Sequence, residues 1–139
     1  MIKRDIIANL ISMLDRPTID LVSLIVTFLK KLCIFEENKN EMLKQGESLI
    51  AKLVKLIPSD NQELQELVFR FLLNLSHDPR FRAFMVKSGL LGKLVGLFEN
   101  GTLTELVIPL IYQLSLDEKH RSYPGFTDCI PIVCFWAIN

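Results

Sequence analysis

The chain repeats a pattern of residues about every forty positions, and this period constrains its fold more than any other feature. An apolar segment recurs at residues 6–14, 49–57 and 90–98, with offsets of 43 and 41 residues. A second element recurs in step, as Lys31-Leu32-Cys33, Asn74-Leu75-Ser76 and Gln113-Leu114-Ser115. Periods of roughly 40–47 residues are typical of solenoids, in which helical units stack on their neighbours. The sequence therefore predicts an all-α stack that works through an extended surface rather than a catalytic pocket.

Charge and hydropathy narrow the classes of partner. The 139 residues carry 16 basic and 16 acidic side chains, so the formal net charge is zero. Affinity for duplex nucleic acid rests on neutralising phosphates, and we therefore expect no nucleic-acid partner. The longest uncharged apolar runs, 21–29 and 129–138, are much shorter than the ~20 residues that a transmembrane helix needs. We therefore expect no insertion into a membrane.

Residue types that carry catalysis or bind metals are present but not at useful spacings. The three cysteines lie in apolar surroundings, and Cys33 takes the position that Ser76 and Ser115 take in the other copies, so we expect reduced, buried thiols. His77 and His120 have no second histidine or cysteine at ligand spacing. No glycine-rich loop suited to a phosphate is present. We predict no cofactor, no metal and no catalytic residue.

Each copy of the repeat reads as three helices. The first helix is short and polar, and we expect it at 38–45, 79–88 and 118–126. The second is amphipathic and covers the recurring segments at 6–14, 49–57 and 90–98. The third is longer and apolar over most of its circumference, and is expected at 18–35, 61–76 and 102–116. A helix of that kind must be covered on most sides.

Several residues predict where these helices begin and end. Asp78 before Pro79 is a typical start, because aspartate can cap the free amides and proline is harmless in the first turn. Gly46 and Gly89 are expected to end the first helices in the left-handed conformation. Capping-box spacing is expected to start two of the third helices, at Ser59 with Gln62 and at Thr102 with Glu105.

We interpret residues 1–139 as a single fragment of a longer array. Its repeats are expected at about 4–46, 47–89 and 90–128, followed by the start of a truncated further repeat at 129–139. The chain opens on a second helix, and its last residues have no charge and no clear polar face. Solenoid ends need polar caps to stay soluble, and neither end supplies one.

Two segments resemble the armadillo repeat. Phe71-Leu72-Leu73-Asn74-Leu75-Ser76 is similar to the end of that family's third helix, and Ser88-Gly89-Leu90-Leu91-Gly92-Lys93-Leu94 is similar to its junction between the first and second helices. The resemblance implies a right-handed α-solenoid of about three armadillo-type repeats with three helices each. Together with the threefold period, it predicts a stack of about nine helices.

Longer segments resemble the kinesin-associated protein family, the non-motor subunits of heterotrimeric kinesin. They are residues 28–42, 52–58, 85–91 and 123–131, the last with Thr127-Asp128-Cys129-Ile130-Pro131. The similarity runs from about Arg4 to Pro131. It implies a cytoplasmic adaptor, associated with microtubules and cilia, whose protein partners are kinesin motor subunits and cargo adaptors.

The third helices supply the candidate partner-binding residues. Peptide-binding armadillo proteins line a concave groove with asparagines and tryptophans, and the resemblance places only Asn74 in that ladder. Lys31 and Gln113 take the other asparagine positions, so a basic peptide of the nuclear-import kind is not expected. A groove of mixed charge suits a charged, amphipathic helix or extended segment better. Its expected residues are Lys31, Glu66, Arg70, Asn74, Glu105 and Gln113.

Three other interpretations stay open. The six groove residues could be no more than the solvated face of stacked helices, because exposed charges contribute little. The chain could be a general armadillo scaffold for peptides, similar to catenins or importins, in another pathway. An RNA-binding helical repeat is the third, and both the zero net charge and the lack of recurrent aromatic residues on the polar face oppose it.

Overall fold

The computed structural model describes residues 4–117, and every regular element in that range is a helix. The order along the chain is α1 (Arg4–Ser12), the 3-10 turn η1 (Met13–Asp15), α2 (Ile19–Leu32), α3 (Glu36–Lys44), α4 (Gly46–Lys55), α5 (Gln62–Leu75), α6 (Pro79–Lys87), α7 (Leu90–Glu99) and α8 (Thr104–Leu114). The predicted first helix at 118–126 and the segment at 129–139 lie outside the described residues.

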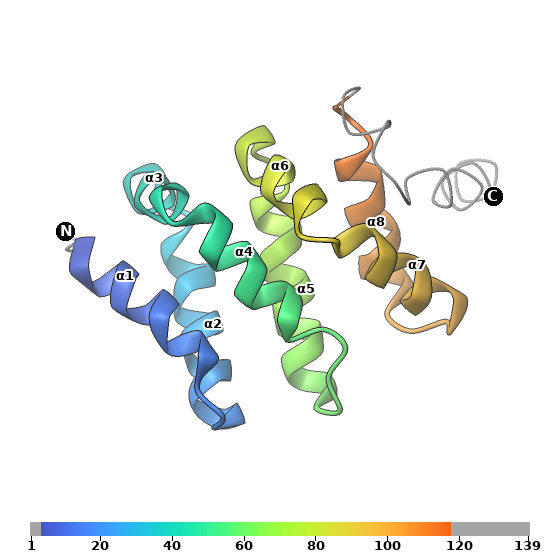
Figure 1. Cartoon of the computed structure of the whole chain (residues 1–139), viewed down its shortest axis with the longest axis horizontal. Helices are drawn as coiled ribbons and strands as arrows, with labels where there is room; N and C mark the ends of the chain where they lie inside the picture. The colour runs from blue at the N-terminus through green and yellow to red at the C-terminus, as the bar shows by residue number, and fades with distance from the viewer. Residues whose placement is uncertain (1–3, 118–139) are drawn as a thin grey trace.

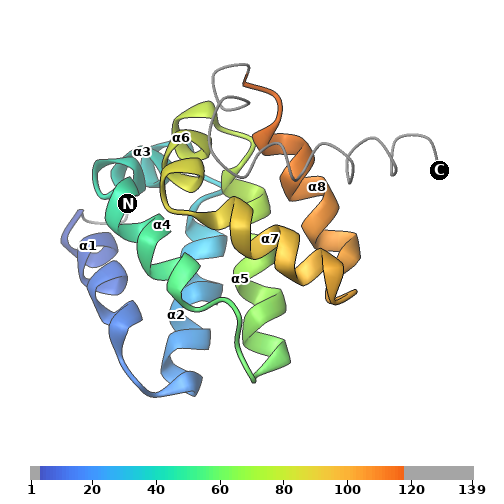
Figure 2. The ribbon, with the colours of Figure 1, turned by 45° about the vertical axis from the view of Figure 1, so that its right-hand side comes forward.

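Three helical hairpins lie in a row, joined by the short helices α3 and α6 (Figure 1). The second helices α1, α4 and α7 form one layer, and the third helices α2, α5 and α8 form another behind it (Figures 1 and 2). Neighbouring third helices pack directly, α2 against α5 and α5 against α8. Over residues 4–117, the prediction of an all-α, stacked arrangement is confirmed. The right-handedness of the stack, the count of three repeats and the repeat boundaries stay predictions.

Helix α5 shows why a third helix is apolar on most of its surface. It packs against α2 on one side and α8 on the other, with α4 alongside. Its Phe69, Phe71 and Leu72 have no exposed surface. Leu53, Leu75 and Leu94 are fully buried as well. Burial of this kind stabilises a fold by roughly 1.5–3 kcal/mol for each large side chain, before the loss of conformational entropy is counted.

Two of the predicted helix boundaries are confirmed by their geometry. Asp78 caps α6: its side chain accepts a hydrogen bond from the Arg80 amide at 2.9 Å, with Pro79 in the first turn. Gly89 follows α6 with φ of 83°, in the left-handed region where glycine carries no steric cost. The Arg80 side chain also donates to the Asp78 carboxylate, and this hydrogen bond lowers the pKa of Asp78 to about 2 against the opposing effect of burial.

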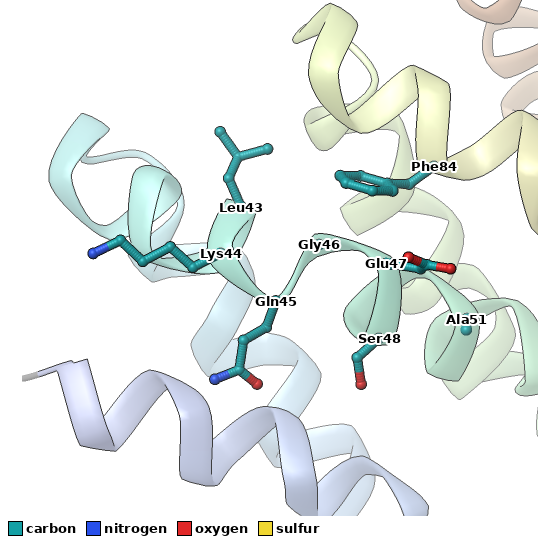
Figure 3. A pocket seen from close by; sticks show the side chains of 8 residues that line it. All are labelled: Leu43, Lys44, Gln45, Gly46, Glu47, Ser48, Ala51 and Phe84. Carbon is teal, nitrogen blue, oxygen red and sulfur yellow. The ribbon is translucent and has the colours of Figure 1, made fainter.

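The prediction for Gly46 was wrong. It does not end α3 in a left-handed conformation; α3 ends at Lys44, and Gly46 is the first residue of α4. Its role is steric, because the Phe84 ring of α6 lies over its backbone (Figure 3). A Cβ added at Gly46 would stand 2.6 Å from Phe84 Cε2, which is closer than real contacts allow. The glycine therefore lets α6 approach the start of α4.

Both predicted capping boxes were also wrong. Asn61, not Ser59, is the N-cap of α5, because its side chain accepts from the Leu64 amide at 2.9 Å. Ser59 instead accepts from the Asn61 amide and so shapes the turn before the cap. At α8 the N-cap is Leu103, in the left-handed region with φ of 49°, and no side chain caps that helix. For several of the helices, the predicted first or last residue also differs from the observed one by one to three positions.

One recurring position ends all three third helices in the same way. Cys33, Ser76 and Ser115 are the residues that follow α2, α5 and α8. Each side chain donates to the carbonyl three residues earlier, at 3.0, 2.6 and 2.6 Å. The predicted equivalence of these three residues is confirmed. Cys33 is half-buried, and this desolvation raises the pKa of its thiol.

Lysines on the second helices connect successive hairpins. Lys52 of α4 donates to the Ile11 carbonyl near the end of α1 at 3.3 Å, and pairs with Asp15 at 2.9 Å. Lys93 of α7 donates to the carbonyls of Val54 and Ile57, at the end of α4, at 2.7 and 2.6 Å. Carbonyls at a helix C-terminus lack intrahelical partners and carry partial negative charge, so a lysine there is favourable. We name these two contacts the lysine ties.

A second set of contacts joins the first helices to the next hairpin. Lys39 of α3 pairs with Asp78, after α5, at 3.6 Å. Arg82 of α6 pairs with Asp117, after α8, at 2.7 Å, and also donates to the Ser76 carbonyl. In both cases a basic residue on a first helix reaches an aspartate just beyond the following third helix. The same kind of contact is therefore used at two successive junctions.

Leu72→Ala is expected to lower the free energy of unfolding by about 2–5 kcal/mol, because the cavity left behind adds to the lost transfer energy. Leu24→Ala is the control, since Leu24 is 68% exposed and its truncation should stay within roughly 0.5 kcal/mol. Denaturant titration with helicity as the signal measures both. Equal, small losses for the two variants would contradict the described packing of α5.

Gly46→Ala is expected to lower stability by about 1 kcal/mol or more, because the new methyl group displaces the Phe84 ring. Gly92→Ala on α7 is the matched control. No atom lies within 4 Å of its added Cβ, so it should raise stability by roughly 0.5–1 kcal/mol through helix propensity. The melting temperatures of the two variants are compared with that of the parent protein. A shift of both melting temperatures in the same direction would refute the steric role of Gly46.

Asp78→Asn is expected to cost about 1–2 kcal/mol at pH 7, because asparagine keeps the cap but loses the pairs with Arg80 and Lys39. A carboxyl whose pKa is lowered to about 2 on folding contributes stability above its unfolded pKa, near 4, and loses it as the pH falls through the folded value. The cost of the substitution should therefore fall to roughly half at pH 3. Urea titrations at the two pH values test this, with Asp60→Asn at an exposed turn as the control.

Candidate functional site

The six predicted groove residues lie on the third helices, with their side chains wholly or partly exposed. Lys31 belongs to α2, while Glu66, Arg70 and Asn74 belong to α5. Glu105 and Gln113 belong to α8. Because α2, α5 and α8 lie side by side, these residues share the layer that faces away from α1, α4 and α7 (Figure 2). We call the set the third-helix stripe. That it lines a concave groove stays a prediction.

Two residues of the third-helix stripe form an ion pair with each other. Arg70 donates from Nε and Nη2 to Glu66 Oε1, at 3.1 and 2.8 Å, one turn apart on α5. Both side chains are about half exposed, so the pair contributes little to stability. A ligand that binds Arg70 must compete with Glu66 or bind both of them. The centre of the stripe therefore offers a charge pair rather than a field of one sign.

The other four residues of the stripe are available to a ligand. Lys31, Asn74, Glu105 and Gln113 make no side-chain hydrogen bond or ion pair with any residue between 4 and 117. They offer an ammonium, two amides and a carboxylate. Amides can donate to and accept from a peptide backbone, while the two charges can select opposite charges on its side chains. This donor and acceptor set suits a protein segment of mixed polarity.

Large apolar side chains lie beside the stripe, and they were missed by the sequence analysis. Leu24 and Phe28 of α2 are 68% and 46% exposed, and Tyr112 of α8 is 55% exposed. The apolar pattern of α2 predicted cover on most sides, but no described helix lies on its outer side. Phe28 is equivalent in the repeat register to Phe71 of α5, which is fully buried, so the register alone predicted burial for Phe28 as well. The surface therefore combines apolar side chains at its flanks with polar groups between them.

Two of the hollows in the described part of the surface have no stripe residue in their lining. The larger, with a volume of about 550 Å³, is open to solvent where α3 meets α4 beneath Phe84 (Figure 3). It is lined by Leu43, Lys44, Gln45, Gly46, Glu47, Ser48, Ala51 and Phe84. Lys44 pairs with Glu41 on its own helix. The smaller hollow, of about 230 Å³, lies between the α1–α2 and α4–α5 turns.

Two features of the described residues bear on other functions. No group of three or more histidine, cysteine, aspartate or glutamate residues between 4 and 117 is placed to hold a metal ion. No helix in the same range combines the length and the apolar character that crossing a bilayer requires.

Comparison with known proteins extends over nearly the whole chain. The model of the kinesin-associated protein (KAP) family matches residues 1–138. No solved structure matches the chain. The family match covers all the described helices and all six residues of the third-helix stripe. The chain therefore belongs to the kinesin-associated protein family.

Proposed function

We propose that this chain is a non-catalytic adaptor that holds kinesin motor subunits and cargo adaptors on the surface of its third helices. The family supports the association with kinesin. The observation that carries the choice of surface is the set of four unpaired polar side chains, with Leu24, Phe28 and Tyr112 at its flanks. Exposed aromatic and leucine side chains beside polar groups are typical of protein-binding surfaces.

The partner segment that fits this surface is amphipathic. Its apolar side chains would cover Leu24 and Phe28, and its polar groups would meet Lys31, Asn74 and the Glu66–Arg70 pair. The net charge of zero supports a protein partner over a nucleic acid, whose binding would need a basic face. Adaptors of this kind act in microtubule-based transport, and we extend the proposal to the cytoplasm and the cilium on the strength of the family.

Charge reversal of Lys31 and Arg70 together is expected to weaken capture of a purified heterodimeric kinesin by roughly ten-fold or more. Each exposed contact contributes only ~0.2–1 kcal/mol, but reversal adds repulsion where like charges are forced together. Immobilised Lys31→Glu/Arg70→Glu protein is compared with the parent by surface plasmon resonance. Far-ultraviolet circular dichroism confirms that both remain helical.

Lys87→Glu on α6 is the matched control, because it reverses an exposed lysine outside the third helices. Equal capture by the double variant and the control would move the binding surface away from the stripe. Leu24→Ser tests the apolar flank separately, and it should weaken capture without altering the helical signal.

A further inference from the structure

The smaller hollow lies where the first two hairpins turn, along the edge opposite α3 and α6 (Figure 1). One wall is the segment between η1 and α2, and the other is the segment between α4 and α5. The lining residues come from both turns, from the last residue of α4 and from the first residues of α2 and α5: Arg16, Pro17, Ile19, Val22, Lys55, Leu56, Pro58, Ser59 and Leu64. The hollow therefore exists only because two hairpins are stacked.

Both walls are held in place by hydrogen bonds from outside the hollow. The lysine tie of Lys52 holds Asp15 and the Ile11 carbonyl, next to the first turn. The lysine tie of Lys93 holds the Val54 and Ile57 carbonyls, next to the second turn. The second turn is fixed further by Gln65, whose Oε1 accepts from the Ser59 amide at 2.8 Å. A site built in this way is formed before any ligand arrives, which lowers the entropic cost of binding.

The hollow is small, and both polar and apolar atoms line it, with apolar side chains at its floor. Val22 and Leu64 are almost fully buried at its floor, and Ile19, at the start of α2, is 45% exposed. A volume of about 230 Å³ is below the roughly 300–1,000 Å³ of pockets for drug-sized ligands. It suits one or two apolar side chains of a longer segment that continues over the surface.

The two cations of the lining are unpaired. Arg16 and Lys55 come from opposite walls and are both exposed, and neither side chain bonds to another residue in the range 4–117. Asp15, beside Arg16, is already held by Lys52. The other nearby carboxylates in the sequence, Asp20, Asp60 and Glu63, do not line the hollow. A ligand that brings carboxylates to this rim would meet two cations that have no competing partner.

We propose that this hollow binds an extended, acidic peptide segment, with one or two apolar side chains inside and carboxylates on either side at Arg16 and Lys55. The apolar floor, the fixed walls and the two cations on opposite walls together define this ligand. None of the six stripe residues lines the hollow: Lys31 lies about 18 Å along α2 from Ile19 at the helical rise of 1.5 Å per residue, and Glu66 follows Leu64 by two residues on α5. The proposal does not depend on the proposed adaptor surface.

The test uses the whole chain and a synthetic probe, the dye-labelled peptide Gly-Ser-Glu-Asp-Leu-Leu-Asp-Ser-Gly with both ends blocked. Saturable binding by fluorescence anisotropy is expected, and it should weaken as salt is raised. Arg16→Glu/Lys55→Glu should weaken it roughly ten-fold or more. Amide chemical-shift changes in isotope-labelled protein should centre on Ile19, Val22, Leu56 and Leu64.

Matched peptides and variants assign each result. A peptide with Gln and Asn in place of the acids, or with Ser in place of the leucines, should bind at least several-fold more weakly. Lys87→Glu and the stripe variant Lys31→Glu/Arg70→Glu should bind like the parent. Arg16→Gln/Lys55→Gln repeats the test without charge reversal, should the first pair disturb folding.

Absence of saturable binding to the parent would overturn the proposal. The proposal would also be overturned if both Arg16/Lys55 double variants, the rim variants, bound the peptide as tightly as the parent protein. Loss of binding in the stripe variant alone would overturn it as well. Kinesin capture is measured on the same proteins. A rim variant that no longer binds the peptide but still captures kinesin would show that this site is distinct from the proposed adaptor surface. The two proposals are therefore tested independently of each other.

Discussion

The packing of each third helix between its neighbours is the constraint on which the rest of this structure depends. Helix α5 is apolar around most of its surface, so it is stable only where α2, α4 and α8 cover it. That requirement brings the third helices side by side and turns their few polar positions toward solvent. The third-helix stripe is therefore a consequence of core packing. Burial of the apolar residues sets the orientation of each third helix, and this orientation leaves the polar residues in line on the surface.

Polar contacts then fix how far apart the hairpins lie. The lysine ties place an ammonium against the free carbonyls of the preceding second helix, and the pairs of Lys39 and Arg82 reach the aspartates beyond the following third helix. Each is satisfied across a junction rather than within a hairpin. Apolar packing alone tolerates sliding, whereas the charge-assisted bonds of Lys93 and Arg82 are short and directional. The lysine ties also hold the walls of the hollow between the first two hairpins.

Local signals in the sequence predicted much of the fold, and signals that depend on neighbours in space did not. The helices, the burial of Leu53, Leu72, Leu75 and Leu94, and the cap at Asp78 follow from spacing and residue type. Gly46 was misread because its reason is the Phe84 ring, which is 38 positions away in the sequence. The six stripe residues lie on the third helices, and that they bind a partner stays a prediction. The exposure of Leu24 and Phe28 beside them was not predicted, since it depends on which helices surround α2.

The lysine ties have a mechanical consequence. Every such contact joins hairpins that are next to each other, and each spans about forty residues of sequence. A tensile load applied at the two ends of the stack would therefore pass through the junctions in series, one after another, instead of being shared among them. The force at which the stack comes apart would be set by its weakest junction. The hairpins on either side of that junction would stay folded.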